Sequence, residues 1–222
     1  MNNSNKIPVY CVPGLAANSK IFEFISLPKD TFEMYYLEWL IPLHIEETLS
    51  DYALRMCALI QHENPILIGV SFGGILVQEM SKLIKTQKVI IISSIKNNQE
   101  FPKQLKLIKS TGAYKLFPTK IVAHIEDYEK YFLGGFLKKR AEMYKIYLSV
   151  RDPLYLHWSI YNVLHWNQKE SLPNIIHIHG TTDHVFPLKY INNAIEIEKG
   201  THAMILIKAK NISKIIQEAL TC

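Results

Sequence analysis

Two runs of apolar, mostly β-branched residues constrain the fold of this chain more than any other feature. They are PILIGV (65–70) and KVIIISSI (88–95), and the segment between them, GGILVQEMSKLIK (73–85), has a helical pattern. A strand that is apolar on both of its faces is typical of a parallel sheet covered by helices on both sides. The sequence therefore predicts an α/β protein with buried parallel strands at its centre.

Further strands and helices alternate along most of the chain. The sequence predicts strands at 7–14, 32–39, 174–180 and 193–198, and helices in 19–26, 48–63 and 208–220, with Thr48 or Ser50 as the N-cap of the second helix. From 97 to 170 the alternation stops, and the sequence is rich in aromatic residues with a mostly helical pattern. We interpret this stretch as a helical insertion over an edge of the sheet.

The length and composition favour one domain that carries an insertion. With 222 residues, of which 48% are apolar and 20% charged, the chain can bury one sizeable core but does not require two full domains. The predicted organisation is a core formed by 1–96 and 171–222, with a helical cap formed by 97–170. No internal repeat or low-complexity segment interrupts it.

Several classes of protein are disfavoured by the sequence. The start, MNNSNKIPVY, has no apolar stretch typical of a secretory signal, and charges break the later apolar runs, so we expect a cytoplasmic protein without a membrane span. Cys11, Cys57 and Cys222 lack paired spacing, which disfavours disulfides and zinc sites. A net charge of +5 is too small to argue for nucleic acid. We expect no metal and no cofactor.

The segment GVSFG (69–73) places one serine between two glycines where the strand meets the helix. A strained turn from strand to helix projects a serine Oγ above the edge of a sheet, where it can act as a nucleophile. Gly69 and Gly73 would allow backbone segments to approach where a Cβ atom would clash. The alternative is that Ser71 is an ordinary helix N-cap.

A serine hydroxyl needs a base and a group that orients the base. Asp183 follows a predicted strand in HGTTDHVFP (179–187), where its carboxylate would lie at the carboxyl edge of the sheet. His202 follows the next strand, in EKGTHAM (198–204). The alternative for Asp183 is a role in forming a turn.

Four segments together resemble the α/β-hydrolase superfamily. VPGLAANSKIF (12–22), GVSFGG (69–74), HGTTDHVFP (179–187) and GTHAM (200–204) occur in the order of that family, and the resemblance covers nearly the whole chain apart from the insertion. It implies an α/β-hydrolase fold with a mostly parallel sheet of about six strands, beginning at the family's third strand. It also implies that the insertion is the helical cap of the active site.

The resemblance implies a role for each residue of a catalytic triad. Ser71 would be the nucleophile, Asp183 the acid and His202 the base. Where the family often has His-Gly after its third strand, this chain has Pro13 and Gly14, so the expected oxyanion hole consists of the backbone N–H groups of Leu15 and Phe72.

The other histidines have less support for a role. His177 and His179 alternate along one predicted strand and could be two metal ligands, but the sequence offers no third ligand, which favours packing. His184 could compete with His202 as the base. Five more carry no motif: His44, His62, His124, His157 and His165.

The predicted cap holds aromatic and basic side chains. Some of the aromatic residues could line an apolar pocket, although such residues at helical spacing usually pack in a core. They are Tyr114, Phe117, Tyr131, Phe132, Phe136, Tyr144, Tyr147, Tyr155, Trp158, Tyr161 and Trp166. KKR (138–140) and four lysines between 103 and 115 are either a solvated surface or a docking surface for an acidic carrier protein.

These observations predict a serine hydrolase of acyl esters that needs no metal. The favoured activity is that of a carboxylesterase acting on a small or medium apolar ester, and the second is that of a thioesterase or a carrier-protein ester hydrolase. A third alternative, from another class, is a protein of this fold that binds a small molecule without turnover. If Asp183 is not the acid, Asp152 in VRDPLY (150–155) is the next candidate.

Overall fold

A computed structural model describes residues 6–116 and 146–221 of the chain. These residues form a six-stranded sheet of order β2-β1-β3-β4-β5-β6, in which each pair of neighbours is parallel. The strands are β1 (Ile7–Val12), β2 (Phe32–Tyr36), β3 (Ile66–Val70), β4 (Lys88–Ile92), β5 (Ile176–Gly180) and β6 (Ile195–Ile197). The predicted α/β architecture with buried parallel strands is confirmed.

The order of the strands reverses direction next to β1. The chain passes from β1 outward to β2 at one edge, then returns to β3 on the other side of β1 and continues through β4, β5 and β6. In the register, Cys11 of β1 lies between Tyr36 of β2 and Ile68 of β3. In open parallel sheets, ligands bind beyond the carboxyl ends of the strands at such a reversal. A ligand site is therefore expected at the segments that follow β1 and β3.

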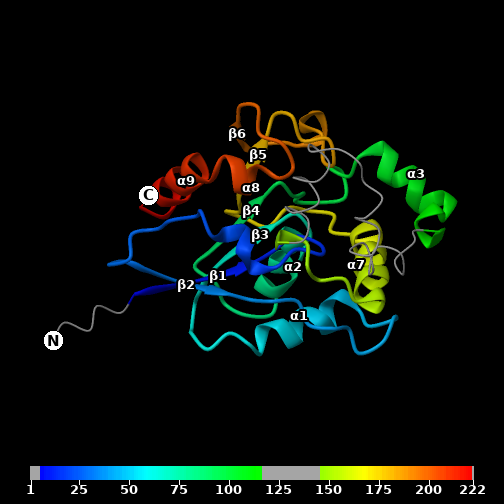
Figure 1. Cartoon of the computed structure of the whole chain (residues 1–222), viewed down its shortest axis with the longest axis horizontal. Helices are drawn as coiled ribbons and strands as arrows, with labels where there is room; N and C mark the ends of the chain where they lie inside the picture. Colours follow the sequence, from blue (N-terminus) through cyan, green and yellow to red (C-terminus); the bar gives the residue numbers. More distant parts are fainter. Residues whose placement is uncertain (1–5, 117–145, 222) are drawn as a thin grey trace.

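Helices cover both faces of the sheet (Figure 1). They are α1 (Leu49–Cys57), α2 (Phe72–Ser81), α3 (Lys103–Thr111), α7 (Pro153–His165), α8 (Met204–Ile207) and α9 (Ala209–Thr221), with short 3-10 helices η1 (Ser19–Phe22), η2 (Ala113–Leu116) and η4 (Leu188–Tyr190). In Figure 1, α1 and α2 lie on one side of the strands, α9 lies on the other, and α3 and α7 lie together at one end of the molecule.

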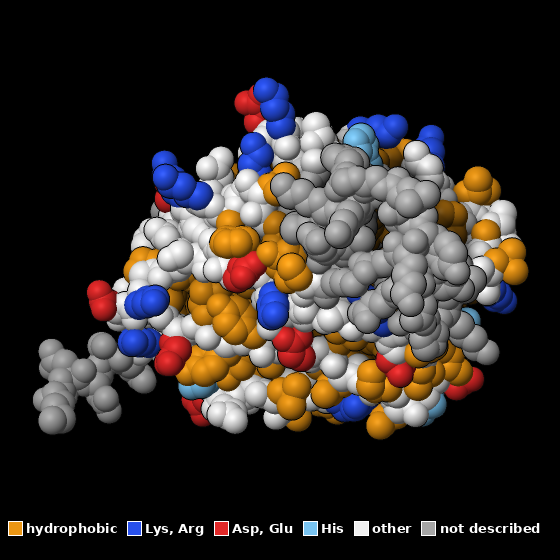
Figure 2. All heavy atoms as spheres, in the orientation of Figure 1, with side chains coloured by type: hydrophobic (Ala, Val, Ile, Leu, Met, Phe, Trp, Pro, Cys, Tyr) orange, Lys and Arg blue, Asp and Glu red, His pale blue; other side chains and the backbone are white. Residues whose placement is uncertain are grey.

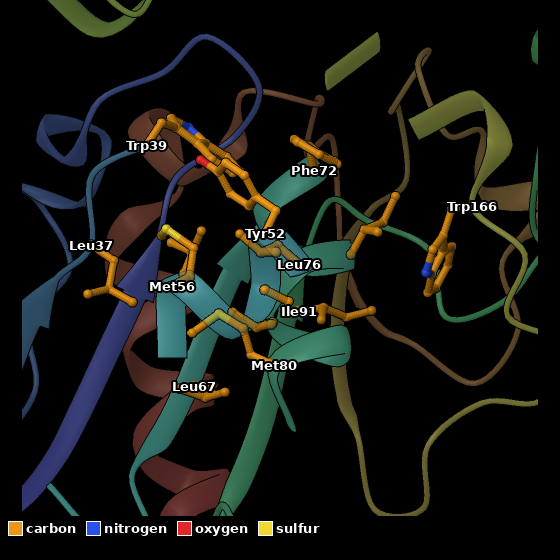
Figure 3. Packing of buried hydrophobic residues seen from close by; sticks show 14 of the residues in the cluster. Leu37, Trp39, Tyr52, Met56, Leu67, Phe72, Leu76, Met80, Ile91 and Trp166 are labelled. Atoms are coloured by element: carbon orange, nitrogen blue, oxygen red, sulfur yellow. The ribbon is translucent and has the colours of Figure 1, made fainter. Parts of the chain in front are cut away.

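Two apolar clusters form the core, one on each face of the sheet. Leu67 and Ile91 belong to the cluster beneath α1 and α2, whose packing is drawn in Figure 3. Ile68 and Ile90, one residue along in each strand, belong to the cluster beneath α9, together with Ile212 of that helix. This alternation follows from the period of two residues in a strand. It explains why these strands are apolar throughout.

The prediction of a helix in 19–26 is wrong, and so are some predicted boundaries of other helices and strands. Only the 3-10 turn Ser19–Phe22 forms there, because a helix between the Asn18 cap and Pro28 would be short and rich in aromatic and β-branched residues. The helix expected at 48–63 begins after the Thr48 cap, as one alternative had it, but already ends at Cys57. The strand expected at 32–39 ends at Tyr36.

The helices α3 and α7 lie in the chain between β4 and β5, within the predicted insertion. Hydrogen bonds join the two ends of that insertion. The Asn98 N–H donates to the Gln168 carbonyl at 2.8 Å, and the Asn97 side-chain amide donates to Ser171 Oγ at 2.9 Å. The chain therefore leaves and rejoins the core at one place. That 97–170 forms a separate unit stays a prediction.

The aromatic residues of the insertion differ in their surroundings. Tyr155, Trp158 and Trp166 are buried in the core cluster under α1 and α2, whereas Tyr161 is exposed. Tyr114 and Tyr147 line a cavity described below. Outside the described residues lie Phe117, Tyr131, Phe132, Phe136 and Tyr144. Most of the described aromatic side chains thus pack, as helical spacing favours.

The described residues indicate whether the protein could bind a membrane or an acidic carrier. None of these helices is long and apolar enough to cross a membrane. On the face drawn in Figure 2, acidic and basic side chains lie interspersed with hydrophobic ones. Of the predicted docking surface for an acidic carrier, Lys103, Lys106, Lys109 and Lys115 are exposed, whereas KKR (138–140) lies outside the described residues. A carrier as partner stays a prediction.

Candidate active site

Ser71 lies in a strained turn between β3 and α2. Its backbone has φ 53° and ψ −117°, a conformation that residues other than glycine rarely adopt and that costs about 1–3 kcal/mol. Although Ser71 occupies the N-cap position of α2, its side chain makes no capping hydrogen bond. The alternative that Ser71 is an ordinary N-cap is therefore wrong, and its hydroxyl is free for another partner.

Two glycines allow this turn to form. A Cβ atom at Gly69 would lie 2.2 Å from the Gly73 carbonyl oxygen. A Cβ atom at Gly73 would lie 2.3 Å from the Pro13 oxygen and 2.4 Å from the Val12 oxygen. All three distances are far shorter than a real contact, so the start of α2 packs directly on the backbone at the end of β1. The two segments at the reversal of strand order are in this way held together.

We expect Gly73→Ala to lower the free energy of unfolding by about 1–3 kcal/mol or more, because the added methyl group must push α2 away from the Pro13 carbonyl. Urea unfolding of the purified variant measures the loss. Gly14→Ala is the matched control, since the nearest atom to its Cβ would be at 3.5 Å, an ordinary contact. Equal stability of Gly73→Ala and wild type would contradict the close packing.

Hydrogen bonds of the backbone fix the Ser71 turn from the next strand. The Ser71 N–H donates to the Ile92 carbonyl at 2.9 Å, and Ser94 Oγ donates to the Ser71 carbonyl at 2.7 Å. Ser94 is fully buried and follows β4. In the sequence, the only sign of this supporting role is the pair of serines at the end of an apolar run.

His202 brings Ser71 and Asp183 into one hydrogen-bonded chain. Its Nε2 atom lies 2.9 Å from Ser71 Oγ, and its Nδ1 atom lies 2.8 Å from Asp183 Oδ2. The three residues come from turns after β3, β5 and β6, 131 residues apart at most. The predicted Ser71, Asp183 and His202 therefore lie together at the carboxyl edge of the sheet.

The environment of Asp183 keeps its carboxyl ionised. Burial raises its pKa, but the hydrogen bond and charge of His202, with the Phe186 N–H, outweigh that effect and hold the pKa below its usual value. Asp183 Oδ1 accepts from the N–H groups of Val185 and Phe186 at 2.8 and 2.9 Å. A carboxylate only accepts, so the proton of the His202 ring lies on Nδ1. Nε2 is then free to accept the Ser71 proton.

The turn after β1 lies beside Ser71. The Trp39 indole N–H donates to the Gly14 carbonyl at 3.0 Å, and the Val150 N–H donates to the Ala16 carbonyl at 3.0 Å. Within the described part of the chain, the N–H groups of Leu15 and Phe72 donate to no other backbone carbonyl. For Phe72 this follows from its place as the first residue of α2. That these two N–H groups form an oxyanion hole stays a prediction.

His177 and His179 form a buried pair behind Asp183. His179 Nε2 must carry a proton because it lies 2.8 Å from the Phe186 carbonyl, which only accepts. His179 Nδ1 therefore accepts from His177 Nε2 at 3.1 Å. Burial is the main cause that lowers the pKa of both rings. Packing, the favoured interpretation, fits this arrangement, and no group of three or more metal-ligating side chains occurs among the described residues.

Two other predicted alternatives have different surroundings. His184 is exposed, whereas the His202 ring bonds to both Ser71 and Asp183. Asp152 is the N-cap of α7, and its carboxylate accepts from the Tyr155 N–H at 2.9 Å. A capping role thus accounts for Asp152 without any catalytic one.

A cavity of about 1060 Å³ opens over Ser71 and His202. The described residues of its wall come from the turns after β1, β3 and β5, from η1, α3, η2 and α7, from residues 147–148 before α7, and from the segment around α8. None of these described residues is Asp, Glu, Lys or Arg, and among them only Ser71, His202, Tyr114 and Tyr147 have a polar group in the side chain. A largely apolar cavity with few polar groups is typical of a small-molecule site.

The structure is similar to several solved hydrolase structures. It matches a bromoperoxidase from Bacillus anthracis with TM-score 0.72 and 14% identity over 98% of this chain and 92% of that one. A structure from work on carboxylesterases of the thaumarchaeon Nitrososphaera gargenis matches with TM-score 0.70 and 16% identity over 100% of this chain and 92% of that one. The chain has the α/β-hydrolase fold.

An enol-lactonase from Burkholderia xenovorans LB400 is also an α/β-hydrolase match, with TM-score 0.69 and 12% identity over 100% of this chain and 94% of that one. No protein-family model matches the sequence, and a search of curated proteins found no match. At these identities the matches establish the α/β-hydrolase fold, and they confirm the fold that the four sequence segments implied.

Proposed function

We propose that this α/β-hydrolase-fold protein is a serine hydrolase of acyl esters, similar to a carboxylesterase. The observation that carries the proposal is the chain of hydrogen bonds from Ser71 Oγ through the His202 ring to Asp183, at 2.9 and 2.8 Å. Ser71 is held in a strained turn at the carboxyl edge of the sheet, which is the usual arrangement of a nucleophile in this fold.

The reaction begins with attack on the ester carbonyl. His202 Nε2 takes the Ser71 proton while Oγ bonds to the carbonyl carbon, and the N–H groups of Leu15 and Phe72 stabilise the negative oxygen that forms. Asp183 stabilises the resulting imidazolium. The His202 ring then gives its proton to the leaving alcohol oxygen as the C–O bond breaks, and an acyl group remains on Ser71.

Water completes the cycle. His202 takes a proton from the water molecule as its oxygen attacks the acyl carbon, and the same proton passes to Ser71 Oγ when the acid leaves. The net reaction consumes one ester and one water molecule and yields one acid and one alcohol. The chain of hydrogen bonds supplies each proton position that these steps need.

We expect Asp183→Asn to reduce ester turnover by up to about four orders of magnitude. Because Oδ1 accepts two backbone N–H groups, the new amide nitrogen would face His202 Nδ1 and force the ring proton onto Nε2. Steady-state hydrolysis of p-nitrophenyl butyrate measures the effect. Asp152→Asn is the matched control, since asparagine also caps a helix, and it should stay within about threefold of wild type.

A mild effect of Asp183→Asn, or a loss in Asp152→Asn of similar size, would contradict the assignment of the acid.

The contribution of Asp183 to the stability of the wild-type fold should depend on pH. The pKa of Asp183 is below its usual value, so its charge stabilises the fold above about pH 3.9 and this contribution is lost as the pH falls through the lowered pKa. The difference in melting temperature between wild type and Asp183→Asn should therefore narrow below pH 4.

A further inference from the structure

Trp39 contacts both segments whose N–H groups are expected to bind the oxyanion. Its indole N–H donates to the Gly14 carbonyl at 3.0 Å, directly before Leu15. Its ring stacks on the Phe72 ring, with centres 5.1 Å apart and an angle of 13° between the planes, and both side chains lie at the top of the cluster drawn in Figure 3. Trp39 is buried and comes from the loop after β2. One core side chain therefore links the two halves of the expected oxyanion hole.

The Gly14 carbonyl and the Leu15 N–H belong to the same peptide group. A trans peptide is planar, so its C=O and N–H bonds point in opposite directions, and no cis peptide occurs among the described residues. The Gly14 carbonyl is directed to Trp39, in the core cluster under α1 and α2. The Leu15 N–H is therefore directed away from the indole, and both Gly14 and Leu15 line the cavity over Ser71. The hydrogen bond of the indole thus sets the direction of the Leu15 N–H.

Gly14 lies directly beside the proposed nucleophile. A Cβ atom at Gly14 would be 3.5 Å from Ser71 Cβ and 3.6 Å from the Val70 carbonyl oxygen. The oxygen of an ester carbonyl attacked by Ser71 Oγ would therefore lie close to the peptide that follows Gly14. A donor there stabilises the transition state only if it points at the position of the developing negative charge. The orientation of one peptide then decides whether the Leu15 N–H can act.

The next residue of the turn is strained and is held by the insertion. Ala16 has φ 62°, a conformation that residues other than glycine rarely adopt. Its N–H donates to Tyr155 OH at 3.4 Å, and its carbonyl accepts from the Val150 N–H at 3.0 Å. A strained residue persists only where the surrounding structure fixes it. These two contacts fix Ala16, but neither of them holds the peptide between Gly14 and Leu15.

Two N–H groups hold the Gly14 carbonyl. One, from Ala17 at 3.0 Å, lies within the turn itself, and the other is that of the Trp39 indole. Among the residues that the structure describes, Trp39 gives the only hydrogen bond from outside the turn to the Gly14–Leu15 peptide. Glycine restricts its backbone less than any other residue. The Gly14–Leu15 peptide would therefore rotate more easily without the indole N–H.

We propose that Trp39 is a positioning residue of the oxyanion hole and directs the Leu15 N–H to the carbonyl oxygen of the attacked ester. This rests on the proposed function, because the oxyanion forms only if Ser71 attacks. In the attack, Ser71 Oγ bonds to the carbonyl carbon, the carbonyl π electrons move to the oxygen, and the hydroxyl proton passes to His202 Nε2. Trp39 takes no part in these steps and acts through the direction of one peptide.

Trp39→Phe removes the indole N–H and keeps an aromatic ring that can stack on Phe72. Loss of one oxyanion donor costs about 10²–10³ in kcat, and the Ala17 N–H still holds the Gly14 carbonyl, so we expect kcat for p-nitrophenyl butyrate to fall by about tenfold to a hundredfold. KM should change by less than about threefold, because the contact is made only in the transition state. Steady-state rates over a range of ester concentrations measure both constants.

Trp158→Phe is the matched control. Trp158 is also a buried indole that donates to a backbone carbonyl, that of Glu47 at 2.7 Å, and its ring centre lies 5.9 Å from that of Phe72. The control should lower the melting temperature to a similar extent and leave kcat within about threefold of wild type, since a lost hydrogen bond in the core destabilises the fold wherever it lies. Equal losses of kcat in Trp39→Phe and Trp158→Phe would overturn the proposal.

A transition-state analogue separates positioning from packing. Ser71 Oγ adds to the carbonyl carbon of 1,1,1-trifluorohexan-2-one, and the adduct has a negative oxygen at the oxyanion position but no leaving group. In Trp39→Phe its inhibition constant should rise by about the factor by which kcat falls, whereas that of 1-hexanol, which forms no oxyanion, should change by less than about twofold. Equal weakening of both inhibitors, or weakening of neither, would overturn the proposal.

If Trp39→Phe does not fold, replacement of Trp39 by benzothienylalanine tests the same N–H group, because sulfur takes its place in a ring of nearly the same shape. The wild-type protein separates this inference from the proposed function. If wild type hydrolyses esters and the Trp39 variant keeps its kcat, the inference alone is overturned. If wild type neither hydrolyses esters nor binds the trifluoromethyl ketone, both the inference and the proposed function are overturned.

Discussion

Ser71→Ala should lower the turnover of p-nitrophenyl butyrate by about three to six orders of magnitude. The variant removes the atom that bonds to the acyl carbon, while leaving the cavity and the N–H groups of Leu15 and Phe72 in place. Residual activity over the uncatalysed rate is expected from those remaining groups. Initial rates at several substrate concentrations, corrected for the buffer blank, measure the effect.

The fold should survive this change. Ser71 Oγ makes its hydrogen bond to the His202 ring, whereas the backbone atoms of Ser71 hold the turn through Ile92 and Ser94. Ser81→Ala is the matched control at the other end of α2, where Oγ donates to the Gln78 carbonyl. It should keep the wild-type rate. If Ser71→Ala keeps more than a tenth of that rate, Ser71 is not the nucleophile.

His202→Ala should cause a loss of similar size, about three to six orders of magnitude. Without the ring, nothing takes the Ser71 proton in the attack or returns it to the leaving oxygen. The control is His184→Ala, one residue after the acid, whose side chain is exposed and should be replaceable with less than about a threefold change. Turnover of p-nitrophenyl butyrate by both variants, each with its melting temperature, distinguishes the two histidines.

The pair of variants decides which histidine is the base. A full loss in His184→Ala together with a retained rate in His202→Ala would reassign the role to His184 and contradict the geometry around Asp183. Equal and partial losses in both would argue for a base that neither histidine supplies.

Much of the core could be predicted because its pattern is local. The β3–α2–β4 unit follows from two apolar runs around a helical segment, and the position of Ser71 follows from two glycines that a strand-to-helix turn requires. Asp183 and His202 could be placed because each follows a short strand whose carboxyl end must lie at the same edge of a parallel sheet.

The contacts that support the site depend on distant pairs of residues and left no local signal. Nothing in the sequence near Trp39 indicates that its indole holds the Gly14 carbonyl. The aromatic residues of the insertion were candidates for a pocket lining, but their spacing does not separate Tyr147, which lines the cavity, from Trp158, which is buried in the core. The apolar spacing in 19–26 predicts a helix, but Pro28 leaves too short a segment for one, so only the 3-10 turn Ser19–Phe22 forms. The periodicity of apolar residues predicts that a helix or strand is present, but it does not predict the residue at which that helix or strand ends.

The most direct test of the central claim is to locate the covalent bond. Wild-type protein treated with a fluorophosphonate and digested with trypsin should carry the adduct on the peptide 56–82, and fragmentation should place it on Ser71 and not on Ser81, the other serine of that peptide. Labelling should be prevented by an excess of an ester substrate. An adduct on another residue, or hydrolysis of esters by a protein that forms no adduct, would contradict Ser71 as the nucleophile.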